Sequence, residues 1–140
     1  MLKPITAAGG LVFRFSNQGH LQVLLILRNG VWDIPKGKLE ANESIPMCAV
    51  REVAEETSAE LPMIVKDLGT TYHEYSQKGV EYGKTTYWYA MILPRPGILI
   101  PQTNEGIEQI NWVEIGKARD EVGYQNLVDI IDRFNSWIGL

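Results

Sequence analysis

The sequence predicts an α/β (α+β) domain in which a mixed β-sheet lies between helices. Segments rich in β-branched, aliphatic and aromatic residues fill the first and middle parts of the chain and are separated by short polar turns. A charged helical segment stands between them, and the C-terminal segment repeats apolar residues at helical spacing. The order along the chain is strands, then a helix, then further strands and a closing helix. This order favours a sheet that is covered by helices.

The N-terminal part predicts strands joined by turns. Val, Leu, Ile and Phe dominate the candidate strands, and polar residues with glycine interrupt them at 16–19 and at Asn29-Gly30. The third strand leads into residues 35–37, a Pro-Lys-Gly segment that is predicted to be a loop. The predicted strands are residues 5–15, 21–28 and 31–34.

A helix is predicted after Ser44. The Ser44 side chain is suited to cap its first turn, and Pro46 would fall in that turn, where a missing N–H group has little effect. Pro62 follows the segment and is expected to keep the helix from continuing. Ala49 and Val53 share a side of the helix that can pack against a core.

The second half predicts a hairpin, a loop, a strand and a helix. Residues 63–75 and 82–93 are rich in β-branched and aromatic residues around a polar link. Prolines mark a loop after the hairpin, within which residues 98–100 could form a short edge strand. Residues 109–114 predict one more strand. The closing helix is predicted from Leu127, Ile130, Ile131, Phe134 and Ile138.

The composition indicates one globular domain that spans residues 1–140. Apolar residues make up 45% of the chain and charged residues 21%. Cys48 is the lone cysteine, so it cannot form an internal disulfide and is expected to be a small core residue in a reducing compartment. No apolar run approaches the roughly 18 residues that a membrane span requires. A cytoplasmic protein without a membrane partner is therefore expected.

The net charge of -4 argues against a nucleic acid polymer as partner, because duplex binding draws on clustered Lys and Arg. A nucleotide-sized anion remains compatible with this charge, since it needs only a few local cations and a bound metal. The oligomeric state stays open between a monomer and a homodimer.

Glu52, Glu55 and Glu56 are predicted to share one face of the helix. At about 100° per residue, Glu55 and Glu56 lie within about 60° of Glu52, one on either side. Like charges this close repel one another, whereas a hard divalent cation with oxygen ligands turns the repulsion into attraction. The face is therefore interpreted as a magnesium site. Replacing Glu55 or Glu56 with glutamine should leave the stability of the metal-free protein unchanged or higher.

The alternative for such a helix is a solvated amphipathic face in which Arg51 and Glu55 pair at i,i+4. The residues that precede the helix favour the functional interpretation. Together they resemble the Nudix box, the family pattern G-x5-E-x7-R-E-U-x-E-E-x-G-U, where U is a bulky aliphatic residue. The matching positions, which include every charged position of the box, are Gly37, Glu43, Arg51, Glu52, Glu55 and Glu56.

The resemblance extends beyond the box and has two departures. Residues 7–13, the Trp-Asp-Ile-Pro segment at 32–35 and residues 111–113 are similar to this family, so most of one domain is covered. Ser58 stands where the family has Gly, and Ala59 where it has a larger aliphatic residue. A Ser in the left-handed conformation that closes a helix would cost about 1 kcal/mol, which concerns stability more than chemistry.

The resemblance implies the Nudix α/β/α sandwich and hydrolysis of a phosphoanhydride bond with Mg2+, or with Mn2+ in its place. A divalent ion neutralises phosphate oxygens, polarises phosphorus and lowers the pKa of a bound water. Glu52, Glu55 and Glu56 would supply carboxylate ligands. The resemblance adds the backbone carbonyl of Gly37.

The general base stays open between residues of the helix and residues of a later loop. Glu52 or Glu56 could take the proton of the attacking water, although a carboxylate bound to a metal is a weaker base than a free one. In some family members the base comes from a later loop, and here Glu105 or Glu108 could serve; the alternative for this pair is a solvated loop. Arg51 is interpreted as an orienting residue that fixes neighbouring glutamates by fork-like hydrogen bonds.

The candidate phosphate-binding cations are Arg28, Lys36, Lys38 and Lys84, any one of which alone is more often a surface charge. Lys36 and Lys38 flank the glycine of a Pro-Lys-Gly loop like that of dinucleoside polyphosphate and diphosphoinositol polyphosphate hydrolases. His73 could donate to a phosphate or stack on a base, or be a strand histidine satisfied by a neighbour. The candidates for stacking on a base, if they are not core residues, are Trp32, Tyr75, Tyr82 and Tyr124.

These residues predict a Mg-dependent Nudix pyrophosphohydrolase that cleaves a nucleoside diphosphate linked to another group. Dinucleoside polyphosphates are the first candidate substrates. The alternatives within the enzyme class are a nucleoside triphosphate pyrophosphatase that clears damaged nucleotides and an ADP-ribose hydrolase. The alternative from another class is a non-catalytic module that senses a nucleotide, since one fold hosts many functions.

Overall fold

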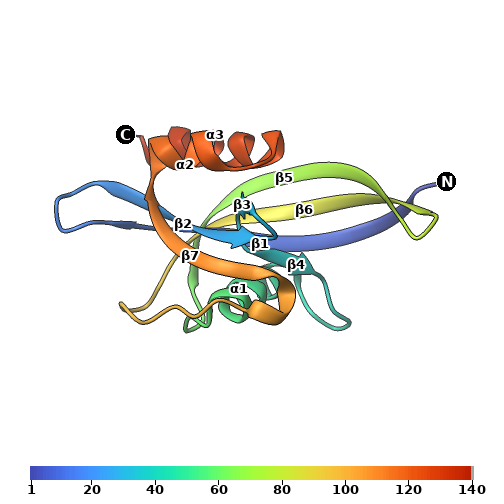
Figure 1. The fold of residues 1–140 in the computed structure, drawn as a ribbon, viewed down its shortest axis with the longest axis horizontal. Helices are drawn as coiled ribbons and strands as arrows, with labels where there is room; N and C mark the ends of the chain where they lie inside the picture. Colours follow the sequence, from blue (N-terminus) through green and yellow to red (C-terminus); the bar gives the residue numbers. More distant parts are fainter. Residues whose placement is uncertain (140) are drawn as a thin grey trace.

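The computed structural model describes residues 1–139. Figure 1 shows a twisted sheet with α1 (Ile45–Thr57) on one face and α2 (Ile115–Glu121) and α3 (Gln125–Ile138) on the other. The sheet contains parallel and antiparallel pairs, so the predicted mixed sheet between helices is confirmed. The strands and the short 3-10 helix are β1 (Lys3–Phe15), β2 (Leu21–Arg28), β3 (Val31–Asp33), β4 (Lys36–Lys38), β5 (Met63–Gln77), β6 (Val80–Ile92), η1 (Thr103–Glu105) and β7 (Ile107–Glu114).

Strand β1 lies at the centre of the sheet and changes partners along its length. The strand order is β3-β2-β1-β6-β5, with β4 paired to β1 and β7 paired to β2. Most of β1 runs parallel to β6, whereas its last residues, 13–15, pair antiparallel with β2. On its other side β1 holds β4, with Ala8 opposite Gly37. The residues that open the predicted box are therefore fixed at the edge of the central strand.

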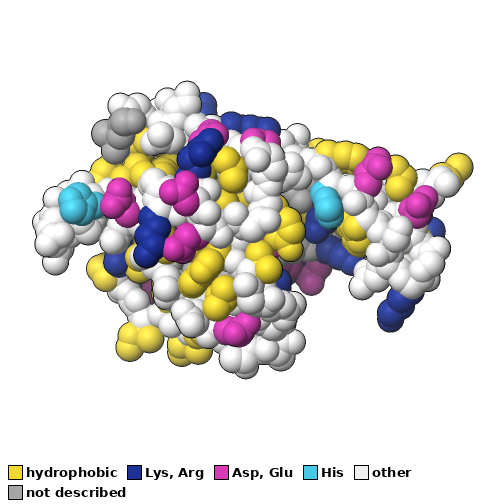
Figure 2. Space-filling view, turned by 45° about the horizontal axis from the view of Figure 1, so that its top comes forward, with side chains coloured by type: hydrophobic (Ala, Val, Ile, Leu, Met, Phe, Trp, Pro, Cys, Tyr) yellow, Lys and Arg dark blue, Asp and Glu magenta, His cyan; other side chains and the backbone are white. Residues whose placement is uncertain are grey.

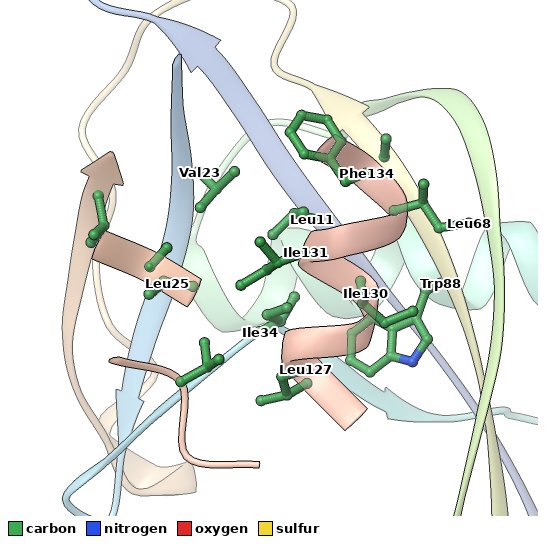
Figure 3. Close-up of a cluster of buried hydrophobic side chains, with 14 of the residues drawn as sticks. Leu11, Val23, Leu25, Ile34, Leu68, Trp88, Leu127, Ile130, Ile131 and Phe134 are labelled. Carbon is green, nitrogen blue, oxygen red and sulfur yellow. The ribbon is translucent and has the colours of Figure 1, made fainter. Parts of the chain in front are cut away.

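Two hydrophobic clusters fill the space on either side of the sheet. The cluster under α3 includes Leu25 and Phe134, and Figure 3 shows its side chains converging between the helix and the strands. The other cluster contains Leu24 and packs against α1. Leu24 and Leu25 enter opposite clusters because successive strand side chains point to opposite faces. Cys48 is fully buried in the α1 cluster, as predicted for a core residue, and burial raises its pKa to about 11.

Serine residues stand at both ends of α1. The Ser44 hydroxyl accepts from the Met47 backbone N–H at 3.3 Å, which confirms the predicted cap. Ser58 adopts the left-handed conformation with φ 59° and ψ 22°, which confirms its expected place at the helix end. Its hydroxyl donates to the Ile100 carbonyl at 3.1 Å. This hydrogen bond ties the loop after β6 to the end of α1.

Ser58→Gly is expected to raise the free energy of unfolding by up to about 1 kcal/mol. Glycine adopts the left-handed conformation without the steric cost of a Cβ, although the exposed bond to Ile100 is lost. Ser58→Ala is the matched control, because it loses the same hydrogen bond and keeps the strain, so it should be less stable than wild type. Urea unfolding of the three proteins measures the differences. A Gly variant no more stable than the Ala variant would contradict the argument.

Three local features differ from the sequence-based expectations. Lys36 and Gly37, predicted as part of a loop, belong with Lys38 to β4, because β1 offers this segment a free edge. Residues 98–100 form no strand; Ile100 instead donates its backbone N–H to Thr57 at 2.9 Å, which leaves the segment on the helix rather than on the sheet. Helix α2 was not predicted, and only Ala118 of its residues is buried, so its apolar signal is weak.

The hairpin of β5 and β6 forms as predicted and turns at Lys78-Gly79, both with positive φ. In Figure 1 it extends beyond the helices on the side of the N-terminus. Over residues 1–139, every helix is too short or too polar to cross a membrane.

Candidate functional site

Arg51 binds three glutamates on one side of α1. Its Nε and Nη2 donate to the two carboxylate oxygens of Glu43 at 2.6 and 3.0 Å, which is the expected fork. Its Nη1 donates to Glu52 at 2.9 Å and to Glu55 at 3.2 Å. The hydrogen bonds from Arg51 lower the pKa of Glu43 to about 2. Glu52, Glu55 and Glu56 are called the acidic face of α1. Arg51 therefore fixes two of its side chains, Glu52 and Glu55, relative to the loop that precedes the helix.

Glu56 faces a second guanidinium group. Arg28, at the end of β2, donates from Nη2 to Glu56 Oε2 at 2.7 Å, and the Lys36 backbone N–H donates to Oε1 at 3.2 Å. Glu56 is only 2% exposed, and this burial raises its pKa to about 7 against the lowering effect of Arg28. A carboxylate with a pKa near neutrality can accept and release a proton, which a general base requires.

Glu52 lies directly over Gly37. A Cβ at position 37 would overlap the Glu52 carboxyl group, so the close approach requires a glycine there. Burial raises the pKa of Glu52, and the hydrogen bond from Arg51 opposes this shift. The Gly37 carbonyl accepts from Cys48 Sγ at 3.6 Å, which directs it toward the helix. The backbone of β4 and the acidic face of α1 thus meet at one point.

The donor set at this point is compatible with a hard divalent cation. All of its side-chain donors are carboxylate oxygens, as such ions prefer, and a backbone carbonyl stands beside them. In the described part of the chain, 1–139, no three His, Cys, Asp or Glu side chains are gathered tightly enough to enclose a metal ion. Arg51 lies between Glu52 and Glu55, and Arg28 binds one oxygen of Glu56. A cation would compete with these guanidinium groups for the same oxygens.

Arg28, which binds Glu56, also lines a cavity of about 260 Å³. Its charged and titratable lining residues are Arg28, Asp33, Lys36, His73 and Lys84. Burial, together with the charge of Lys36, lowers the pKa of Lys84. Figure 2 shows a histidine together with Lys and Arg side chains at a hollow between the body of the molecule and the extended hairpin. This cavity offers cationic and hydrogen-bonding groups to an anion that lies next to the acidic face.

The structure brings some of the predicted residues into the cavity and leaves others outside it. Lys38 is absent from the lining, and its backbone carbonyl accepts from Arg51 at 3.1 Å. Glu105 lies on η1 with its carboxylate 3.9 Å from Arg28 Nη1, close to the site but exposed. Glu108 is engaged elsewhere, because it accepts from the Gly30 backbone N–H at 3.0 Å.

The aromatic candidates occupy different places. His73 stacks on Tyr75, with ring centroids 5.8 Å apart, and Tyr75 stacks in turn on Tyr82 at 5.2 Å. Tyr124 lines the cavity and is 55% exposed, so one of its sides is accessible. Trp32 packs against the core cluster under α3. The aromatic groups that remain available to a ligand therefore come from the hairpin and from the start of α3.

Sequence reasoning missed several lining residues of the cavity. Asp33 was noted only as part of the Trp-Asp-Ile-Pro segment, yet it is 5% exposed and its Oδ2 accepts from Lys36 Nζ at 3.1 Å. An acid at the end of a strand, three residues before a lysine, was the available signal. Thr71, Thr86 and Asn126 also line the cavity, and no sequence pattern marks such neutral residues.

Comparison with known proteins adds to this geometry. Residues 3–134 match the protein-family model for the NUDIX domain. The chain belongs to the NUDIX family. Among its NUDIX relatives, an 8-oxo-(d)GTP phosphatase from Mycolicibacterium smegmatis is 27% identical over 140 residues, a match that covers 93% of this chain and 41% of that protein. The chain thus spans less than half the length of this relative.

Solved structures with this NUDIX fold come from several organisms. An Ap4A hydrolase from C. elegans superposes with a TM-score of 0.79 at 21% identity and covers 96% of this chain and 97% of its own. The NUDIX domain of NrtR from Shewanella oneidensis, complexed with ADP ribose, superposes with a TM-score of 0.75 at 18% identity, covering 99% and 90% of the two chains. At these identities the similarity establishes the fold, which confirms the predicted Nudix sandwich.

Proposed function

We propose that this NUDIX chain is a divalent-metal-dependent pyrophosphohydrolase that cleaves a phosphoanhydride bond in a nucleotide, with residues 1–140 acting as one unit. The observation that carries the proposal is the contact between two parts of the site. Arg28 belongs to the lining of the cation-rich cavity and also binds Glu56 of the acidic face at 2.7 Å. Phosphate groups in the cavity would therefore lie beside the carboxylates.

Gly37, Glu52, Glu55 and Glu56 would hold Mg2+, or Mn2+ in its place. A divalent ion is typical of the family, and when bound it would supply charge neutralisation for phosphate oxygens and a more acidic water. Arg51 orients Glu52 and Glu55 through its hydrogen bonds to both. Glu52, Glu56 and Glu105 remain the candidate bases, and the burial of Glu56 favours it among them.

Dinucleoside polyphosphates are the first candidate substrates. Arg28, Lys36 and Lys84 converge on one cavity, which is more positive charge than a single diphosphate requires. Each charge-assisted contact to a phosphate can contribute about 1.5 to 3 kcal/mol. His73 and Tyr124 at the same cavity could contact a base. The structural similarity to an Ap4A hydrolase accords with this choice.

A nucleoside triphosphate carrying a damaged base is the second candidate, favoured by the similarity to the 8-oxo-(d)GTP phosphatase. ADP-ribose is the third, in view of the NrtR domain that was complexed with it. A nucleotide-sensing module without turnover is the alternative from another class.

A substrate panel separates these candidates. Dinucleoside polyphosphates of increasing length, 8-oxo-dGTP, dGTP and ADP-ribose would be incubated with Mg2+ and the products separated by chromatography. We expect kcat/KM to rise with the number of phosphates, because longer chains engage more of the cavity cations. Higher efficiency with 8-oxo-dGTP or ADP-ribose would overturn the first choice. Binding without turnover of any compound would favour the sensing module.

Lys36→Ala should lower kcat/KM selectively for the longer substrates. Lys38→Ala is the matched control: it removes the same charge from the neighbouring position outside the cavity lining, and a smaller effect is expected. Equal losses from the two variants for every substrate would show that the cavity does not select by phosphate number.

A further inference from the structure

Asp33 is a buried acid that the catalytic proposal does not use. It ends β3, where its backbone pairs with Ile26 of β2, and its side chain is 7% exposed. Its Oδ1 accepts from the Ile34 backbone N–H at 2.8 Å, which fixes the orientation of the carboxylate. The other oxygen, Oδ2, is directed toward the two cations that line the cavity beside it, Lys36 and Arg28.

These two cations have unequal contacts with Oδ2. Lys36 Nζ donates to it at 3.1 Å, whereas Arg28 Nε is 3.7 Å away, beyond hydrogen-bond distance. Within residues 1–139, Arg28 Nε is the single buried side-chain nitrogen or oxygen atom that has no hydrogen-bond partner. A shift of about 0.8 Å would bring it to the usual length of about 2.9 Å. Oδ2 of Asp33 thus has one bonded donor, Lys36 Nζ, and one nearby donor that has no partner, Arg28 Nε.

We infer that Asp33 is a positioning residue that exchanges partners when a phosphate group binds in the cavity. Lys36 leaves Oδ2 to donate to the phosphate, and Arg28 Nε takes its place on Asp33. Without this exchange, the departure of Lys36 would leave Oδ2 of Asp33 and the Nε–H group of Arg28 both buried and without a hydrogen bond. Each of these unsatisfied groups would cost free energy. The exchange satisfies both groups at once.

The exchange connects phosphate binding to the acidic face. Arg28 already binds Glu56 through Nη2 and the Glu105 carbonyl through Nη1, at 2.7 and 3.3 Å. A further bond at Nε would fix the whole guanidinium plane while the substrate is bound, and with it the position of Glu56. This last step rests on the proposed catalytic role of Glu56, whereas the exchange itself does not.

The direct test is an NMR titration of the metal-free wild-type protein with tripolyphosphate in the presence of EDTA. The Arg28 Nε–H resonance, assigned by its loss in Arg28→Lys, is expected to move downfield and to exchange more slowly with water as the ligand is added. The same titration of Asp33→Asn should leave it nearly unchanged, because the amide oxygen stays on the Ile34 N–H group and the Oδ2 position becomes an NH2 group, which cannot accept from Nε. Asn retains a carbonyl oxygen for the Ile34 N–H group, so folding should be preserved.

Calorimetric binding of the same probe separates the exchange from a general charge effect. Asp33→Asn should bind tripolyphosphate about five- to ten-fold more tightly than wild type, because Lys36 no longer has to leave a carboxylate. In a Lys36→Met background, Asp33→Asn should change the affinity less than about two-fold. Asp132→Asn removes the same charge from the surface pair with Arg119 and should leave binding unchanged.

Turnover provides a separate readout. With a substrate found in the panel, Asp33→Asn should lower both KM and kcat, because Lys36 is freed and Arg28 is held less firmly. Absence of turnover with every substrate would refute the proposed function and leave the two binding measurements valid. The inference itself would be overturned by an unchanged Arg28 resonance in the wild-type titration, by equal tightening in both backgrounds, or by no binding of tripolyphosphate to the wild type.

Discussion

Glu56→Gln is expected to lower kcat/KM by at least about 10²-fold, the usual scale for losing a positioned carboxylate that binds a metal or transfers a proton. Glu55→Gln should also lose most of its turnover, because it removes one charge from the same proposed metal site. The steady-state rate with the best substrate of the panel measures both effects. Glu121→Gln, at the end of α2 and away from the candidate site, is the matched control and should retain wild-type activity.

The two glutamine variants should differ in stability. Glu55 is half exposed and shares Arg51 with Glu43 and Glu52, so Glu55→Gln should leave the free energy of unfolding unchanged or slightly higher. Glu56 is buried against Arg28, and an amide at this position cannot accept from both Arg28 and Lys36. We expect Glu56→Gln to lower the free energy of unfolding by about 1 to 3 kcal/mol. This is less than the cost of a fully unpaired buried charge, because Arg28 keeps Asp33 as a neighbour.

This expectation revises the one drawn from the sequence, in which both substitutions relieved repulsion. Denaturant unfolding without metal provides the measurement, and Mn2+ binding by paramagnetic resonance shows separately whether each variant still holds a cation. Near wild-type turnover in both variants would remove Glu55 and Glu56 from the proposed metal site.

Gly37→Ala is the second change with a large expected effect, a loss of at least about 10²-fold in kcat/KM. The new methyl group would overlap the carboxyl group of Glu52 and displace it. Because that carboxyl is the end of a flexible side chain, it can swing aside at the cost of its hydrogen bond to Arg51. The loss of stability should therefore be small, no more than about 1.5 kcal/mol, while the geometry of the site is lost.

Gly97→Ala is the matched control for this prediction, since a Cβ there meets nothing within 4 Å. Comparison of the two alanine variants by rate, unfolding and Mn2+ affinity separates a displaced ligand from a general effect of alanine. A Gly37→Ala enzyme with wild-type activity would show that the approach of Glu52 to the β4 backbone is unimportant for the reaction.

The fold was largely predictable because its signals are local. Ser44 and Pro46 mark the start of α1, Gly79 marks the hairpin turn, and the apolar spacing of 127–138 marks α3. Strand β4 was missed because Lys36, Gly37 and Lys38 have no intrinsic preference for a strand; β1 imposes it. Residues 98–100 were overestimated as an edge strand because the backbone of Ile100 bonds to the end of α1 instead of to the sheet.

The acidic half of the site was predictable, whereas the cavity was only partly so. Glutamates on one helix are related by helical geometry alone, so their spacing can be read along the chain. The cavity combines residues from β2, β3, β4, β5, β6 and α3, and their proximity depends on strand order. Lys38 was grouped with Lys36 because both flank Gly37. Residues two apart on a strand point to the same side, but Lys38 lies about 6.6 Å further along β4 and does not line the cavity.

The central position of β1 has a consequence for how the chain folds. Its parallel partner β6 comes late in the sequence, and parallel strands require a long crossover connection. Contacts between distant residues slow folding, because the loop between them must close before they contribute stability. Arg28 and Glu56 come well before β6, whereas His73 lies on the preceding strand, Lys84 on β6 itself and Glu105 after it. A nascent chain therefore carries most of its acidic face before the phosphate-binding surface exists, and the two become one site only when β6 docks beside β1.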